Sequence, residues 1–203
     1  MSETARSNEL AKATNSVLLI YYNTARRDTI LDGLGADASV ESMLWRSVPD
    51  MVELVKSTQP TLLIWDVEQQ EIGWEAVAAI SSSAPLPIVV FSSGFDAEDA
   101  KRALQAGVSV YVADDLQSHR IPTLVEIAKE RFRLTSALYD ELQRSKDELA
   151  ARKSIERAKG LLMERRNLSE REAYNAMRRM AMSQGKTVQA IAETILSISD
   201  VLP

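Results

Sequence analysis

The residue types that carry most enzymatic and metal chemistry are nearly absent from this chain. It contains no cysteine and one histidine, His119. Thiolate metal sites, iron–sulfur clusters and cysteine nucleophiles are therefore excluded, and histidine-based metal sites or catalytic triads have a single imidazole to use. A glycine-rich phosphate loop is missing as well. We expect a protein that is not an enzyme and that holds no metal or cofactor.

Basic side chains, which bind nucleic-acid phosphates, are concentrated near the carboxyl end. The 203 residues include 24 basic and 29 acidic ones, a net charge of -5, yet residues 152–186 hold ten basic and four acidic side chains. This asymmetry favours an acidic body with a basic binding module, and a solvated helical face is the alternative. No apolar run approaches the roughly 18 residues of a membrane span. We expect a cytoplasmic protein with a flexible tail at residues 1–15.

Short apolar runs alternate with helix-forming segments through the first half of the chain. The runs SVLLIYY, TLLIWD and PIVVF are typical of strands buried on both faces. Such alternation with short links predicts a flavodoxin-like α/β domain with a five-stranded parallel sheet in the order 2-1-3-4-5. We assign it to residues 16–122, with strands at 16–22, 39–44, 61–66, 87–91 and 108–112.

Asp66 stands at the carboxyl end of the third of these strands. A strand–helix alternation with an aspartate at this point resembles the receiver domain of response regulators. The resemblance implies that Asp66 stands where that family accepts a phosphoryl group. It also implies an acidic pair after the first strand that holds Mg²⁺, a hydroxyl residue after the fourth strand and a lysine after the fifth.

The chain departs from the receiver pattern at several of these positions. Tyr21 and Tyr22 replace the acidic pair, while Ser92 supplies the hydroxyl. Asp114 replaces the lysine and is followed by a second aspartate, so this position would repel a phosphoryl group. A lone carboxylate is also a poor Mg²⁺ site. We therefore interpret the domain as a pseudo-receiver in which Asp66 is a vestigial phospho-acceptor position; a functional acceptor is the alternative.

A long helix is predicted to follow, because no glycine or proline occurs between Pro122 and Gly160. Its residues 123–152 read as a coiled-coil linker with a thin, polar-interrupted seam at 4-3 spacing. A free helix of this length needs a partner, so we expect homodimerisation or packing against another protein, and folding back onto the receiver-like body is the alternative. The seam includes Leu124, Leu138, Leu142 and Leu149.

The last fifty residues, 153–203, predict a compact all-α unit of three helices. Ser169 and Glu172 form a capping box at the start of the second helix, and Gly185 is a left-handed cap at its end. Thr187 caps the third helix. The end of the long helix is the first member of the unit.

The string SIERAKGLLMERRNLSEREAYNAMRRMAM in this unit resembles the ANTAR domain, the RNA-binding module of bacterial transcription antitermination regulators. The whole layout is similar to the nitrate-assimilation branch, the NasT-like proteins. The resemblance implies that the module binds leader RNA with hairpin loops and prevents a downstream terminator from forming. It also implies a nitrate/nitrite-binding sensor protein that holds the regulator inactive. The matching positions are Ala158-Lys159, Leu162-Met163, Leu168-Ser169-Glu170, Glu172-Ala173-Tyr174, Arg178, Ala181-Met182 and Ile191-Ala192.

The residue chemistry of the unit independently suits RNA. Basic side chains bind phosphates, and Tyr174 is placed to stack on an unpaired loop base. A core-edge position for Tyr174, and core positions for the methionines, are the alternatives. A DNA-binding response regulator with a helix-turn-helix and a protein-docking adaptor are the competing functions. The candidate RNA-binding residues are Lys159, Gly160, Met163, Arg166, Tyr174, Arg178, Arg179, Met182 and Lys186.

Overall fold

The computed structural model describes residues 16–44, 48–67, 73–94 and 96–201, so the tail expected at residues 1–15 lies outside the described part. The chain forms two compact units, Met1–Ser136 and Ala137–Pro203. One continuous helix, α6 (Ile121–Arg166), supplies residues to both units. Among the described residues, no helix is both long and apolar enough to cross a membrane.

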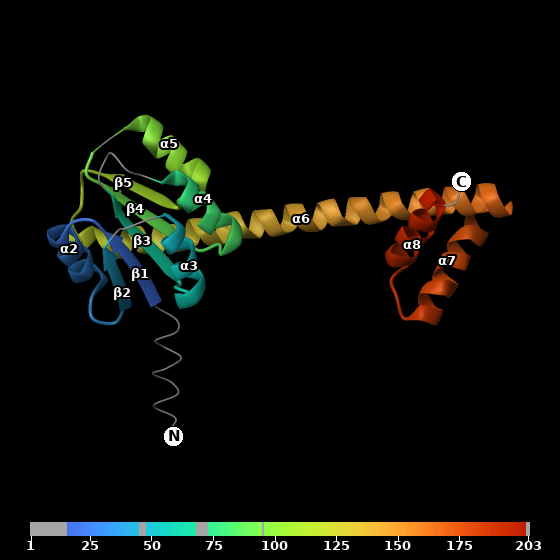
Figure 1. The fold of residues 1–203 in the computed structure, drawn as a ribbon, viewed down its shortest axis with the longest axis horizontal. Helices are drawn as coiled ribbons and strands as arrows, with labels where there is room; N and C mark the ends of the chain where they lie inside the picture. The colour runs from blue at the N-terminus through green and yellow to red at the C-terminus, as the bar shows by residue number, and fades with distance from the viewer. Residues whose placement is uncertain (1–15, 45–47, 68–72, 95, 202–203) are drawn as a thin grey trace, which may run out of the picture. The chain divides into compact units, whose positions relative to one another are not determined.

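The first unit is built on a parallel sheet of five strands in the order β2-β1-β3-β4-β5, which confirms the predicted topology (Figure 1). Helices connect the successive strands, as parallel pairing requires. The strands are β1 (Ser16–Tyr21), β2 (Ser39–Leu44), β3 (Leu62–Val67), β4 (Ile88–Ser92) and β5 (Val110–Ala113). The helices are α2 (Thr24–Leu34), α3 (Val48–Thr58), α4 (Trp74–Ser83) and α5 (Ala97–Ala106), and a 3₁₀ helix, η1 (Ser118–Arg120), precedes α6.

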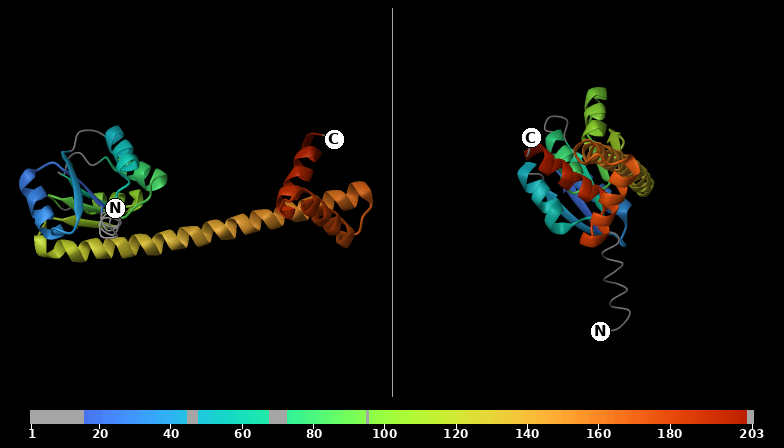
Figure 2. Two further views of the ribbon diagram at one scale, coloured as in Figure 1. Left: turned by 90° about the horizontal axis from the view of Figure 1, so that it is seen from below. Right: turned by 90° about the vertical axis from the view of Figure 1, so that its right-hand side faces the viewer.

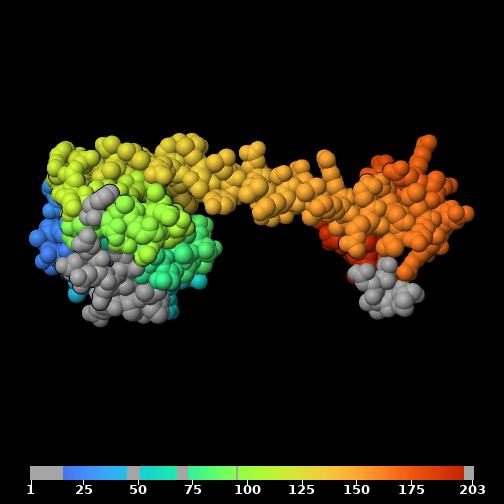
Figure 3. Space-filling view, turned by 90° about the horizontal axis from the view of Figure 1, so that it is seen from above, coloured from blue at the N-terminus to red at the C-terminus, as the bar shows by residue number. Residues whose placement is uncertain are grey.

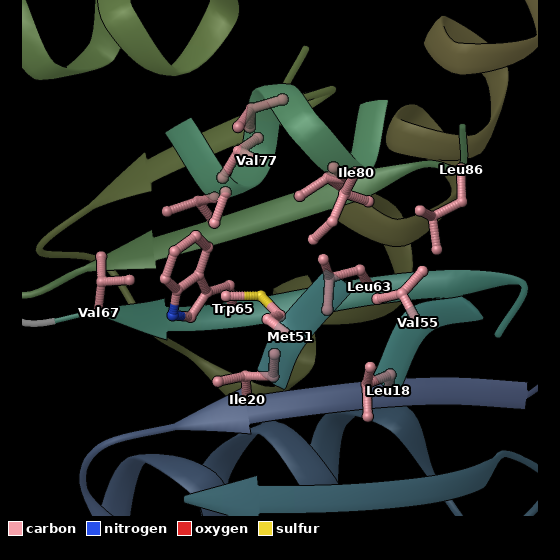
Figure 4. Packing of buried hydrophobic residues seen from close by; sticks show 14 of the residues in the cluster. Leu18, Ile20, Met51, Val55, Leu63, Trp65, Val67, Val77, Ile80 and Leu86 are labelled. Carbon is pink, nitrogen blue, oxygen red and sulfur yellow. The ribbon is translucent and has the colours of Figure 1, made fainter. Parts of the chain in front are cut away.

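The sheet is buried on both faces, because successive side chains of a strand point in opposite directions. On one face, Leu18 and Trp65 pack against α3 and α4, where Ile80 is fully buried (Figure 4). On the other face, Leu19 packs in a second cluster with Ile30 of α2 and with the first turns of α6. The apolar runs found in the sequence thus form the centre of the unit.

The first turns of α6 belong to the receiver-like unit. Ile121, Val125 and Ala128 are spaced at helical intervals and are buried in the second cluster, and Leu124 packs against them. Two predictions are corrected here: the domain core continues past residue 122 into the segment assigned to the linker, and Leu124 is not a free seam position. The physical reason is that a sheet buried on both faces needs helices on both, and α6 joins α2 on this one.

The middle of α6 is exposed, as Figure 3 shows for the face in view (yellow to orange). Leu138 is 67% exposed, and Leu142 and Leu149 are 50% and 54% exposed. The long helix is confirmed over 46 residues, while its pairing with another helix stays a prediction. These three leucines are the part of the predicted seam that a partner can reach.

The second unit packs the end of α6 with α7 (Glu170–Gln184) and α8 (Val188–Val201), as Figures 1 and 2 show. Ser169 and Glu172 form the predicted capping box, and Gly185 ends α7 in the left-handed conformation at φ 62°. The Thr187 hydroxyl accepts a hydrogen bond from the amide of Ala190 at 3.2 Å and caps α8. The three-helix unit is therefore confirmed. Its core residues are Ala158, Met177, Ala181, Ile191 and Ala192.

Candidate nucleic-acid interface

One face of α7 presents cations and an aromatic ring to solvent. Arg171, Tyr174, Arg178 and Met182 follow one another at spacings of three and four residues, so they lie along one side of the helix. We call these four residues the α7 row. All four are exposed, Tyr174 at 43% and Met182 at 75%. Met177 and Ala181 on the adjacent side of α7 face the core, and the row itself is exposed to a ligand.

The cations of the α7 row are available for phosphate contacts. Neither Arg171 nor Arg178 forms an ion pair with any residue that the structure describes. Arg166 at the end of α6, Arg179 on α7 and Lys186 after α7 are exposed as well. The charge needed to bind a nucleic-acid backbone therefore sits on the surface of the second unit.

Lys159 has different surroundings from those expected of a phosphate contact. It is only 8% exposed, and its ammonium group lies 2.8 Å from Glu156 and 2.7 Å from Glu170. The two carboxylates, Glu156 first, raise the pKa of Lys159, and the ammonium group lowers the pKa of Glu170. Lys159, predicted as a phosphate contact, is thus buried and paired with carboxylates, because a side chain at this point of α6 faces the start of α7.

Two further candidates on α6 lie on its outer surface. Gly160 is exposed, and a Cβ built there would have no neighbour within 4 Å. A glycine inside a helix destabilises it by roughly 0.5–1 kcal/mol relative to alanine, so the fold itself gives no reason for this residue. Met163 is 38% exposed and does not act as core filler. Both positions are open to a ligand.

The Asp66 position in the first unit holds a partly buried ion pair. Asp66 on β3 is fully buried, the Arg26 side chain is 21% exposed, and Nε of Arg26 donates a hydrogen bond to Oδ1 of Asp66 at 2.7 Å. The second carboxylate oxygen and Nη2 of Arg26 are buried and have no hydrogen-bond partner among the described residues. Burial raises the pKa of Asp66 to about 6, and Arg26 opposes the rise.

Arg26 is the residue of this site that the sequence reasoning missed. It lies in the first turn of α2, directly after β1 and the cap residue Asn23. The parallel strands β1 and β3 are neighbours, so their carboxyl ends meet and the turn after β1 reaches Asp66. The sequence signal that could have revealed this pair is the basic residue that follows shortly after the first strand.

The surroundings of Asp66 do not suit Mg²⁺, the ion that a functional receiver would hold. Asp66 is the one carboxylate in the ion pair with Arg26, and the guanidinium group of Arg26 already binds one of its oxygens. Tyr21 lies under the guanidinium of Arg27, 5.2 Å from it, and the hydroxyl of Ser92 donates to the Gly94 carbonyl at 2.9 Å. Within the described ranges, no three histidine, cysteine or acidic side chains gather as a metal site.

Comparisons with known proteins agree with both units. The ANTAR domain family matches residues 143–196. The transcriptional regulatory protein PdtaR of Mycobacterium tuberculosis is 32% identical over 148 residues, which is 72% of each chain. The nitrate regulatory protein of Klebsiella oxytoca is 32% identical over 75 residues, 37% of this chain and 19% of that protein.

Solved structures match the fold of the first unit. The crystal structure of NtrX from Brucella abortus superimposes with a TM-score of 0.50 at 21% identity, over 62% of this chain and 29% of that one. At this identity the likeness concerns the fold alone. PdtaR, in contrast, shares both sequence identity and most of its length with this chain. The chain therefore belongs to the family of ANTAR-domain transcriptional regulators with a receiver-like amino-terminal domain.

Proposed function

We propose that the chain is a transcription antitermination regulator whose second unit binds leader RNA with hairpin loops and prevents a terminator from forming. The observation that carries the proposal is the α7 row, in which two arginines without an ion pair among the described residues flank an exposed tyrosine. Proteins that read RNA by sequence favour loops, whose unstacked bases can lie on aromatic side chains. Arginines beside such a ring supply the phosphate contacts.

Binding to duplex DNA is supported less well than binding to RNA. A helix-turn-helix reads the major groove with a recognition helix whose polar and basic side chains reach the bases. The third helix of the unit, α8, contains no lysine or arginine. The charge of the unit lies instead on α6, α7 and the turn after α7.

Control by protein binding fits the exposed leucines of α6. A helix that exposes Leu138, Leu142 and Leu149 buries them by pairing with another helix. A second copy of the chain or a sensor protein is such a partner in this proposal. The likeness to a nitrate regulatory protein supports nitrate or nitrite assimilation genes as targets. It supports equally a nitrate/nitrite-binding sensor protein that sequesters the regulator.

Control by phosphorylation is not part of the proposal. An acyl phosphate at Asp66 requires a free, ionised carboxylate and a bound Mg²⁺. Arg26 binds one carboxylate oxygen, and the Asp66 side chain is fully buried. The receiver-like unit in this view acts through protein contacts.

The first prediction concerns RNA binding by the α7 row. Arg178→Ala weakens binding to a two-hairpin leader RNA and lowers the slope of log K against log salt by about 1, because one phosphate contact is lost. Tyr174→Leu weakens binding while the slope stays unchanged, because stacking releases no counterions. Gel shifts over a salt series measure both effects.

Arg102→Ala on the exposed side of α5 is the matched control, since it removes the same charge from the first unit. Unchanged RNA affinity in both α7 variants contradicts the proposed interface. Equal affinity for duplex DNA at the same salt favours a DNA-binding regulator, and loss of all nucleic-acid binding by the unsubstituted chain favours an adaptor.

The second prediction uses the open space at Gly160. Gly160→Ala raises the free energy of unfolding by about 0.5–1 kcal/mol, because alanine is the better helix former. The same substitution weakens RNA binding if the RNA backbone lies against this point. Urea unfolding and gel shifts of one preparation measure the two effects. Thr135→Ala, at an exposed position of α6 in the first unit, should add stability and leave RNA affinity as it was.

The third prediction concerns the charge of Asp66. Its pKa is about 6 in the folded chain, above the ordinary value of 3.8, so the native state binds the proton more tightly than the unfolded state. The stability contributed by Asp66 is full below about pH 4 and is lost between about pH 4 and 6, a total of about 3 kcal/mol. Urea unfolding from pH 4.5 to 8 should show about 2 kcal/mol of this fall in the unsubstituted chain. The fall should be absent in Asp66→Asn.

The same residue gives the test of phosphorylation. Acetyl phosphate or beryllofluoride with Mg²⁺ should leave Asp66 without an adduct in mass spectrometry and should leave RNA affinity unchanged. A stoichiometric adduct on Asp66 that alters RNA binding would show that the unit is a functional receiver.

The fourth prediction concerns the sensor. A nitrate/nitrite-binding sensor protein should lower the RNA-bound fraction in a gel shift without nitrate and release the regulator when nitrate is added. Leu138→Glu with Leu142→Glu should abolish this inhibition, since a charge on the exposed seam opposes helix pairing. Light scattering reports whether the same change also dissociates a homodimer. RNA binding that responds to neither sensor nor nitrate excludes the proposed control.

A further inference from the structure

Lys159 is the one buried basic residue in the part of the chain that the structure describes. Its ammonium group joins carboxylates from two helices: Glu156 lies one turn earlier on α6, and Glu170 is the first residue of α7. Both contacts are short, at 2.8 and 2.7 Å. Most surface lysines are flexible, whereas this one is held at 11% side-chain exposure.

The contact with Glu170 lies where the direction of α7 is set. Between the two helices the chain turns through Asn167, which adopts a left-handed conformation at φ 49°. Ser169 caps the next helix, and Glu170 follows at once. On α6 the neighbour of Lys159 is Ala158, a fully buried residue of the core of the unit. The ion pair therefore connects the inner side of α6 with the first turn of α7.

The charge of this cluster does not favour an RNA phosphate. One ammonium group and two carboxylates carry a net charge of -1, and Glu156 and Glu170 are about two-thirds exposed. A phosphate that approached Lys159 would meet those carboxylates first and would have to displace them. Direct phosphate contact is thus the weaker explanation of a lysine at this position.

We propose that Lys159 is a positioning residue for the RNA-binding face. It ties the first turn of α7 to α6 and so orients the α7 row with respect to the open surface at Gly160. This inference rests on the proposed function, because it assigns Lys159 its part in the same interface. It replaces a direct phosphate contact by an indirect effect through Glu170.

Glu170→Gln separates the two explanations. If Lys159 bound phosphate, removal of a competing carboxylate would leave RNA affinity unchanged or raise it. If Lys159 positions α7, the same change weakens binding although it makes the unit less acidic. Glu164→Gln is the matched control. It removes one exposed carboxylate from the last turns of α6, in the same unit as Glu170, and leaves the Lys159 cluster intact.

The experiment measures the affinity of the full chain for a two-hairpin leader RNA over a salt series. Glu170→Gln and Lys159→Met should each weaken binding by about threefold to fivefold, the upper part of the range of single ion pairs. The salt slope should stay unchanged in both variants, because Lys159 releases no counterions from the RNA. Lys159→Arg should retain affinity, since a guanidinium group also reaches two carboxylates. Thermal melting confirms that each variant is folded at the assay temperature.

Three results would overturn the assignment. A salt slope lowered by about 1 in Lys159→Met identifies a direct phosphate contact. RNA affinity that is unchanged or higher in Glu170→Gln rules out a positioning role while RNA binding itself stands. An unsubstituted chain that binds no hairpin RNA overturns the proposed function, and this inference with it.

Discussion

Helix α6 packs one side into a core near each of its ends, and this constraint shapes both units. Its first turns complete the core of the receiver-like unit through Ile121, Val125 and Ala128. Its last turns supply Ala158 to the core of the three-helix unit. The stretch between has no core of its own, and a lone helix gains little stability in water from backbone hydrogen bonds. Its exposed leucines, Leu138 foremost, are the surface on which the proposed protein association acts.

The receiver-like unit holds an ion pair between Arg26 and Asp66 at the carboxyl end of β3. A buried ion pair commonly contributes less to stability than apolar packing of the same volume, because both charges lose their water. Asp66 bears this desolvation penalty in full, while the Arg26 side chain keeps 21% of its surface exposed. Among the described residues, the second oxygen of Asp66 has no hydrogen-bond partner. Stability alone does not explain such a pair, and the interpretation of Asp66 as a vestigial acceptor position stays a prediction.

Local chemistry made much of the fold predictable from the sequence. The buried strands, the capping box at Ser169 and the left-handed cap at Gly185 each depend on residues a few positions apart, and the structure has all of them. The errors concern contacts between distant segments. The pairing of Arg26 with Asp66 spans 40 residues, and the burial of Lys159 depends on where α7 begins. A heptad pattern likewise cannot reveal that Leu124 faces a sheet.

The small core of the three-helix unit leaves room for a polar contact to fix the angle between its helices. Alanines at Ala158, Ala181 and Ala192 let the three helices approach closely, but they bury little apolar area. Smooth, small side chains also resist sliding and rotation less than interlocking large ones do. A charged contact with fixed donor and acceptor positions supplies the missing directionality, as single polar residues do in coiled coils. The RNA interface proposed here must match both a base and a phosphate, so it needs the two helices held at one angle, and the contact between Lys159 and Glu170 is placed to hold it.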